Sequence, residues 1–204
     1  MTGIWIGQGR HGANPTVPAV LCGLGVSYVA TVLWQVLIAR WRGQGPVRDY
    51  AIGIRWIDVP LGIGVGIAAI LLILGGSELV ATLTGMKLQS TAGDLLLGVQ
   101  VRNALFVVLL LAIAAAGPLV EELHFRGMWF AALDRRLGPL AAIVGSGAIF
   151  AVAHLEAVRL LGLFLCGVLF GVVRWRFRRL GPSFVAHLLL NALSALSVLS
   201  VAPR

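Results

Sequence analysis

The stretch LFVVLLLAIAAAGPLVEELHFRG, residues 105–127, decides how the rest of the chain is interpreted. A run of aliphatic and aromatic residues is followed directly by two glutamates, a histidine and an arginine. A charged side chain at the centre of a bilayer costs roughly 2.5–3.5 kcal/mol on insertion scales. These ionisable groups therefore lie outside the hydrocarbon, or the protein holds them inside it for a purpose.

The composition of the whole chain is that of a membrane protein. Of its 204 residues, 59% are hydrophobic and 12% are charged, whereas soluble domains carry about 25% charged residues. Several apolar runs approach the roughly 20 residues that a membrane-spanning helix needs. We predict an all-α, polytopic transmembrane helical bundle with about six membrane segments embedded in a lipid bilayer. The expected segments are residues 17–39, 58–82, 102–133, 139–156, 158–173 and 181–200.

The third segment is too long for one simple span, and we predict an interruption at Gly117-Pro118. The most loop-like stretch of the chain is 84–94. We divide the sequence into N-terminal membrane helices, residues 1–101, to which no role is assigned, and a functional core, residues 102–200. The functional core contains the ionisable residues of the opening stretch.

The net charge of +8 comes from arginines that cluster between the apolar runs. The clusters lie in residues 40–55, 135–136 and 174–179, and alternating spans place all three on one side of the membrane. The positive-inside rule makes that side the cytoplasm. Because the charges sit at segment ends and form no face of a soluble body, we expect no nucleic-acid partner. Fifteen of the sixteen basic residues are arginine, which indicates a high-GC, bacterial coding bias and hence a bacterial cell membrane.

The two adjacent glutamates face different ways on a helix. Glu122 and Arg126 are four residues apart and share a face, so they are expected to form an ion pair. Glu121 is rotated by about 100° from Glu122, which leaves its carboxylate for another task. The alternative is an interfacial turn whose charges are solvated.

A histidine in the next segment is predicted to lie level with Glu121. The short turn at Gly138-Pro139 makes segments three and four antiparallel, and His154 is about as far after the turn as Glu121 is before it. A carboxylate and an imidazole at one depth form a candidate acid–base pair. The alternative for a lone histidine in an apolar helix is a hydrogen-bonded core position.

The last segment carries His187 and Asn191, which are again four residues apart on one face. Polar side chains in an aliphatic helix need partners within the membrane. Packing between helices is one explanation, but one shared polar site costs less than three separate ones. The predicted site comprises Glu121, Glu122, Arg126, His154, His187 and Asn191.

These residues, in this order, carry a family resemblance. EELHFR (121–126), FAVAH (150–154) and HLLLN (187–191) resemble the EExxxR, FxxxH and HxxxN motifs of the CPBP intramembrane proteases. That family includes the CAAX prenyl endopeptidases of the Rce1 type and the Abi proteins linked to bacteriocin immunity. The resemblance covers about residues 102–200. It implies an endopeptidase that hydrolyses membrane-associated or peptide substrates with activated water.

The resemblance also implies residue roles. Glu121 would be the general base, with His154 as its partner on the water, while His187 and Asn191 would stabilise the oxyanion. Glu122 and Arg126 would order the helix. No cofactor is expected. Zinc is the alternative, because two histidines and a glutamate are possible ligands, although the chain has no HExxH motif.

Two other functional classes are consistent with the sequence. One is a non-proteolytic immunity or binding protein of the same family. The other is a proton-coupled transporter, because intramembrane glutamate and histidine act as proton relays. Transporters are usually longer and often contain inverted repeats, which we do not find here. The sequence specifies neither the substrate nor the oligomeric state.

Overall fold

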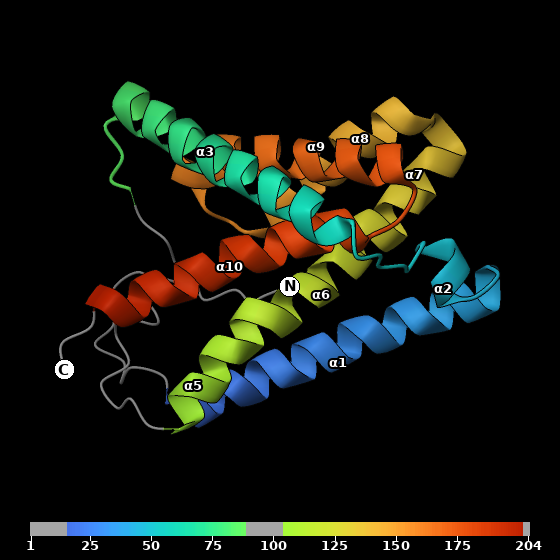
Figure 1. The fold of residues 1–204 in the computed structure, drawn as a ribbon, viewed down its shortest axis with the longest axis horizontal. Helices are drawn as coiled ribbons and strands as arrows, with labels where there is room; N and C mark the ends of the chain where they lie inside the picture. The colour runs from blue at the N-terminus through green and yellow to red at the C-terminus, as the bar shows by residue number, and fades with distance from the viewer. Residues whose placement is uncertain (1–15, 89–103, 202–204) are drawn as a thin grey trace.

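The computed structural model describes residues 16–88 and 104–201, and these residues form a helical bundle (Figure 1). Within those two ranges every regular element is a helix, which confirms the predicted all-α fold. The α-helices are α1 (Val17–Arg42), α2 (Pro46–Asp49), α3 (Asp58–Thr84), α5 (Ala104–Leu111), α6 (Gly117–Glu122), α7 (Phe130–Leu137), α8 (Pro139–Ala153), α9 (Leu160–Phe177) and α10 (Gly181–Val201). Three short elements join them: the π-helical turns η1 (Ala112–Ala116) and η2 (Leu123–Trp129), and the 3-10 turn η3 (Ala157–Arg159).

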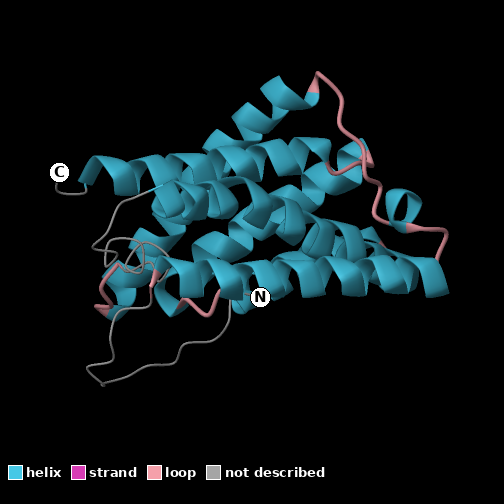
Figure 2. Ribbon diagram, turned by 90° about the horizontal axis from the view of Figure 1, so that it is seen from below, coloured by secondary structure: helices cyan, strands magenta, loops and turns pink. Residues whose placement is uncertain are grey.

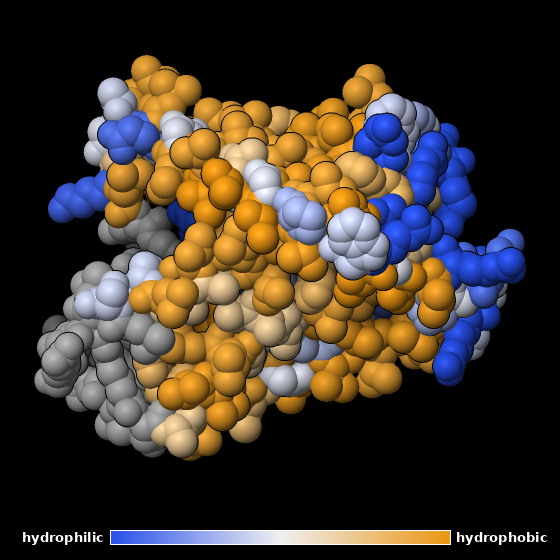
Figure 3. Space-filling model, in the orientation of Figure 1, coloured by the Kyte–Doolittle hydropathy of each residue, from blue (hydrophilic) through white to orange (hydrophobic). Residues whose placement is uncertain are grey.

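The bundle has the dimensions and surface of an integral membrane protein. Four helical stretches are long and apolar enough to cross a bilayer: Val17–Arg42, Asp58–Thr84, Ala104–Leu137 and Ala157–Phe177. The fifteen residues of α8 are also apolar but fall short of a full span. Hydrophobic side chains cover the middle of the molecule (Figure 3). Exposure of so large a hydrophobic surface to water is energetically unfavourable, so we conclude that the protein is embedded in a lipid bilayer.

Helix α10 lies between two groups of helices and positions the candidate site. Helices α3, α8 and α9 pack together on one side of it, and α1 packs against α5 on the other (Figure 1). Figure 2 shows the same bundle of helices from a second direction. Helix α10 contacts α3 and α9 as well as α6 and η1. Residues on α6 and α10 therefore meet at the centre of the bundle.

The long stretch Ala104–Leu137 is one continuous helical path. The predicted interruption at Gly117-Pro118 is therefore wrong: Gly117 has helical φ and ψ of −54° and −60°. Proline normally removes a hydrogen bond and clashes with the carbonyl four residues earlier. The wide turn η1 directly precedes Gly117, and such a turn relieves this conflict. The wide turn η2 directly follows Glu122.

Glycines allow α8 and α9 to approach backbone to backbone. A Cβ on Gly147 would lie 2.8 Å from the backbone nitrogen of Val168, and one on Gly167 would lie 2.7 Å from the Gly147 Cα. Small residues at helix crossings permit this packing in membranes. The carbonyl of Gly167 on α9 also accepts a hydrogen bond from Arg126, which lies in η2.

The three arginine clusters gather at one end of the bundle. Helix α2, the end of α7 and the junction of α9 with α10 lie together in Figure 1, and hydrophilic side chains cover this end in Figure 3. The structure thus agrees with a common side for the three clusters. Which side of the membrane that is stays a prediction.

We predict that the arginine-rich end is cytoplasmic. In a chain carrying Cys22→Ser and Cys166→Ala, a cysteine at Arg48 or Arg178 should resist a membrane-impermeant thiol reagent applied to intact cells. Lys87 is exposed and follows the far end of α3, so Lys87→Cys should react and serves as the control. Labelling at position 48 or 178 from outside would contradict this topology.

Candidate active site

Glu122 and Arg126 form a fully buried ion pair. Arg126 Nη1 donates to Glu122 Oε1 over 3.1 Å, and the two side chains are 0% and 1% exposed. The i,i+4 spacing predicted this pair. Arg126 Nη2 also donates to the carbonyl of Gly167 over 3.2 Å, so the guanidinium links α6 and η2 to α9.

Three aromatic rings surround the Arg126 guanidinium, and that of Phe125 is the most distant, with its centroid 5.9 Å from the central carbon. The same carbon lies 4.5 Å from the ring centroid of Phe150 and 5.1 Å from that of Phe170. A cation over an aromatic face is stabilised, and most strongly where water is excluded. The rings therefore compensate part of the hydration that the buried arginine loses.

His187 is held by the same carboxylate. Its Nδ1 lies 3.1 Å from Glu122 Oε1, and its ring is almost fully buried. An ionised carboxylate only accepts hydrogen bonds, so His187 Nδ1 must carry the hydrogen. The Nε2 atom of the neutral ring then bears the lone pair, and it lies 3.8 Å from Glu121 Oε2.

His154 has the same tautomer for a similar reason. It follows the last residue of α8, and its Nδ1 lies 2.8 Å from the carbonyl oxygen of Phe150. A carbonyl cannot donate, so Nδ1 carries the hydrogen and Nε2 of the neutral ring is the acceptor. That Nε2 lies 3.9 Å from Glu121 Oε2.

Glu121 Oε2 is the point at which three predicted residues meet. The atom is buried and forms no hydrogen bond within the described part of the chain. The two imidazole nitrogens, at 3.8 and 3.9 Å, are too distant for direct hydrogen bonds. Glu121 Oε2 and the two Nε2 atoms are all hydrogen-bond acceptors and surround one space. A hydrogen-bond donor such as a water molecule in this space would satisfy them. The side chains of Glu121 and His154 are 21% and 28% exposed, so this space is reachable from outside.

The same three atoms do not fit zinc as they are placed. A tetrahedral zinc site with bonds of about 2.0–2.1 Å separates its ligand atoms by about 3.3 Å. The separations from Glu121 Oε2 are wider, at 3.8 and 3.9 Å. Across the two described ranges, no group of three or more His, Cys, Asp or Glu side chains is disposed to hold a metal ion.

Asn191 lies one turn from His187 on α10 but has a different partner. Its Nδ2 donates to the carbonyl of Ile113, in the wide turn η1, over 3.1 Å. The structure describes no hydrogen bond between Asn191 and the other five predicted site residues. One amide hydrogen of Asn191 remains for another acceptor.

The N-terminal helix contributes residues that sequence reasoning missed. Trp129 Nε1 donates to His124 Nε2 over 3.1 Å, and His124 Nδ1 lies 3.2 Å from the side-chain amide of Gln35 on α1. The hydroxyl of Tyr50 donates to the Gln35 backbone carbonyl over 2.7 Å. Gln35 is an amide inside an apolar run, and this was the available signal, because such a group needs a partner in a membrane.

Comparison with protein families agrees with the motifs at the site. The family model described as type II CAAX prenyl endopeptidase Rce1-like matches residues 103–193. Residues 103–193, somewhat under half of the chain, are therefore similar to the Rce1-like family. No curated protein and no solved structure matches it. The matched range contains all six predicted site residues, whereas α1 and α3 lie outside it.

We expect Arg126→Ala to destabilise the protein strongly. The substitution leaves Glu122 buried without its cation, and breaking a buried pair in this way costs about 3–5 kcal/mol. Thermal unfolding in detergent should show a large fall in Tm. Arg176 is exposed, so Arg176→Ala is the matched control and should unfold near the wild-type temperature. Equal Tm values for the two variants would contradict the structural role of the pair.

Proposed function

We propose that this protein is an intramembrane endopeptidase in which Glu121 activates water for peptide-bond hydrolysis. The observation that carries the proposal is the position of Glu121 Oε2, unpartnered and facing the Nε2 atoms of His154 and His187. The family match supports a protease of the CAAX type. The residue roles and the substrate are our proposals.

The three acceptors are arranged to orient and deprotonate one water molecule. The water donates one hydrogen to Glu121 Oε2 and the other to an imidazole Nε2, which directs its lone pair toward a peptide carbonyl. As the oxygen–carbon bond forms, Glu121 takes a proton. When the carbon–nitrogen bond of the tetrahedral intermediate breaks, that proton passes to the leaving amine. Glu121 is thereby returned to its carboxylate form.

His187 is fixed by the Glu122–Arg126 pair, in the way that a buried carboxylate orients the histidine of a catalytic triad. With its Nδ1 hydrogen directed at Glu122, His187 can donate from Nε2 only as an imidazolium. Its proposed role toward the oxyanion therefore requires a proton taken up from solvent before the attack, because the proton of the attacking water passes to Glu121. The second hydrogen of that water is then directed at His154 Nε2. The remaining amide hydrogen of Asn191 is the second proposed donor.

The proposed substrates are membrane-associated proteins or peptides. The partly exposed side chains of Glu121 and His154 form the open side of the site, whereas Glu122, Arg126 and His187 form its buried side. An extended peptide segment at the bilayer would approach from the open side. The family's described activity makes a prenylated CAAX peptide the first probe to use.

We predict that Glu121→Gln abolishes cleavage and leaves the fold intact. The amide keeps the shape of the side chain but is not a base, and no buried ion pair is broken. General-base catalysis contributes about 10²–10⁴-fold, so cleavage of an internally quenched farnesylated CAAX peptide in proteoliposomes should fall at least 100-fold. Glu78 is exposed on α3, and Glu78→Gln should keep wild-type activity.

The outcomes of this experiment separate the functional classes. Near-wild-type cleavage by Glu121→Gln would rule out Glu121 as the base. If the wild-type protein cleaves no peptide, a binding or immunity role is favoured, and ion or substrate flux in the same vesicles would indicate a transporter. Membrane proteomes and secreted peptides of cells carrying wild-type or Glu121→Ala protein would identify natural substrates, which should accumulate uncleaved in the mutant.

A further inference from the structure

The hydroxyl of Tyr28 on α1 occupies the space that a side chain at Gly117 would take. A Cβ atom on Gly117 would lie 2.9 Å from Tyr28 Oη and 3.8 Å from Tyr28 Cζ. The first distance is too short for a contact between carbon and oxygen, whereas the second is an ordinary van der Waals contact. Gly117 has helical φ and ψ of −54° and −60°, so its backbone conformation does not require glycine. The glycine therefore serves to admit the hydroxyl.

Gly117 lies one turn before Glu121 on the same helical path, and the two residues share a face. Side chains of a helix lean toward its N-terminus and cover the preceding turn. The side chain of Glu121 therefore extends toward the turn against which Tyr28 Oη rests. In agreement, the Tyr28 hydroxyl lies within electrostatic range of the Glu121 carboxylate.

A second contact of α1 repeats seven residues later. Gln35 lies seven residues after Tyr28 on α1. Its partner His124 lies seven residues after Gly117. Such a repeat indicates two helices that run side by side in the same direction, and Figure 1 shows α1 along α5 and α6. Helix α1 therefore packs along the stretch of helix that carries Glu121.

The proposed site is rich in acceptors and poor in donors. Glu121 Oε2 and the Nε2 atoms of neutral His154 and His187 all accept hydrogen bonds. His187 donates only after it takes up a proton, which leaves one amide hydrogen of Asn191. The Tyr28 hydroxyl keeps its hydrogen at neutral pH, and no hydrogen bond of this hydroxyl exists within the part of the chain that the structure describes. It is therefore free to donate to a group that enters the site.

Asn191 reaches the same turn from α10. In a regular helix the carbonyl of Ile113 points at Gly117 N and accepts its hydrogen. Gly117 N donates instead to the Ala112 carbonyl, and Asn191 Nδ2 takes the vacated position over 3.1 Å. The Asn191 amide and the Tyr28 hydroxyl therefore approach Gly117 from two different helices. Two donors at one turn are the components of an oxyanion hole.

The distance between this turn and Glu121 suits such a role. One helical turn advances by about 5.4 Å. Two successive hydrogen bonds of about 2.7–2.8 Å each span a similar length. The two donors are thus too far from Glu121 to replace its water, yet near enough to reach the oxygen of a carbonyl that this water attacks.

We propose that Tyr28 is a further catalytic residue, whose hydroxyl donates a hydrogen bond to the oxyanion alongside Asn191. This role rests on the proposed protease function. As the water oxygen bonds to the carbonyl carbon, an electron pair of the carbon–oxygen double bond moves to the carbonyl oxygen. The Tyr28 O–H binds the charge that forms there and keeps its proton. Gly117 is a positioning residue because it leaves room for the hydroxyl, and α1, outside the matched range 103–193, contributes to the chemistry.

Tyr28→Phe removes the hydroxyl and keeps the ring. Loss of one oxyanion donor lowers kcat about 10²–10³-fold, so kcat for the farnesylated CAAX peptide in proteoliposomes should fall at least about 100-fold with KM unchanged. A farnesylated peptide whose scissile amide is replaced by an anionic, tetrahedral phosphinate should bind the variant about 100-fold less tightly. A merely structural tyrosine would not weaken the phosphinate relative to the substrate. Near-wild-type kcat, or unchanged phosphinate affinity, would overturn the oxyanion role.

Thermal unfolding of the whole protein in detergent tests the placement of the hydroxyl separately. Gly117→Ala puts a Cβ against Tyr28 Oη and should lower Tm by several degrees. In the double variant Tyr28→Phe/Gly117→Ala the nearest ring carbon is Cζ, at 3.8 Å, so Tm should return at least to that of Tyr28→Phe. Its kcat should stay low because the hydroxyl is still absent. A Cβ on Gly75 of α3 would meet nothing within 4 Å, so Gly75→Ala should lower neither Tm nor kcat.

The failures of the two proposals are distinguishable. Cleavage by the wild-type protein at a rate that Tyr28→Phe matches would overturn the role of Tyr28 alone. An equal effect of Gly117→Ala on Tm with and without Tyr28→Phe would show that the hydroxyl does not contact Gly117, which also overturns that role. Absence of any cleavage by the wild-type protein would overturn the protease function and the oxyanion role together, whereas the Tm values report the contact whether or not the protein is active.

Discussion

The buried ion pair between Glu122 and Arg126 is the interaction on which the rest of the site depends. Two charges removed from water are tolerated only when their remaining hydrogen-bonding capacity is met. Arg126 meets it with the Gly167 carbonyl and with the rings of Phe150 and Phe170. Glu122 meets part of it with His187. One neutralised pair thus connects α8, α9 and α10 to the helix that carries both glutamates.

Adjacent residues in this helix have opposite environments. Glu122 is enclosed and paired, whereas Glu121 is partly exposed and its buried oxygen has no described partner. Helix geometry produces the separation, because a step of one residue turns the side chain by about 100°. The wide turns before Gly117 and after Glu122 bracket the two glutamates. Such turns are frequent at functional sites because they re-aim side chains that a regular helix would place elsewhere.

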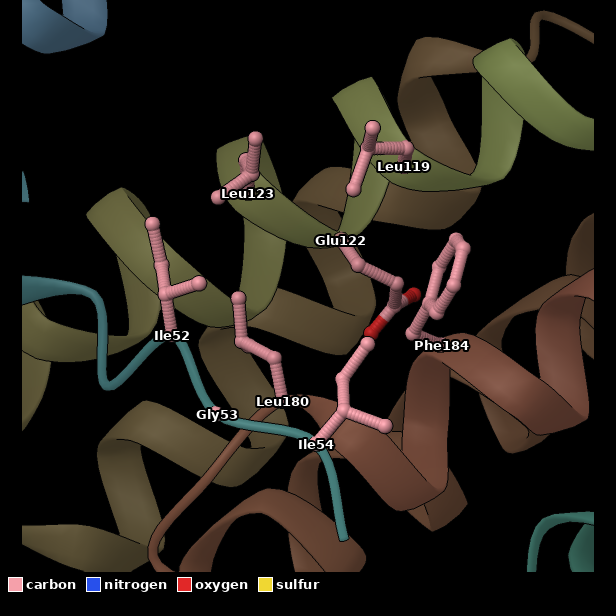
Figure 4. Close-up of a pocket in the computed structure, with 8 residues that line it drawn as sticks. All are labelled: Ile52, Gly53, Ile54, Leu119, Glu122, Leu123, Leu180 and Phe184. Carbon is pink, nitrogen blue, oxygen red and sulfur yellow. The ribbon is translucent and has the colours of Figure 1, made fainter. Parts of the chain in front are cut away.

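The N-terminal helices take part in the organisation of the site. Gln35 on α1 contacts His124, which lies within the EELHFR motif, and residues 52–54 line a small cavity together with Glu122 (Figure 4). Both contacts cross the division that we drew between residues 1–101 and 102–200. Residues 103–193 carry the family match, but part of the support for their buried polar groups comes from outside that range. Gln35 and residues 52–54 thus lie against polar groups of the matched range.

The sequence by itself determined the features that depend on local periodicity. The spacing of Glu122 and Arg126 predicted their ion pair, and the short turn at Gly138-Pro139 placed His154 level with Glu121, because both follow from helix rise and turn length. Tertiary structure alone decided which partner each polar group takes. Asn191 bonds the Ile113 carbonyl, His124 contacts Gln35, and the helix continues through Pro118. These outcomes depend on which distant backbone groups and cavities the packed helices bring within hydrogen-bonding distance, and residue spacing within one helix does not contain that information.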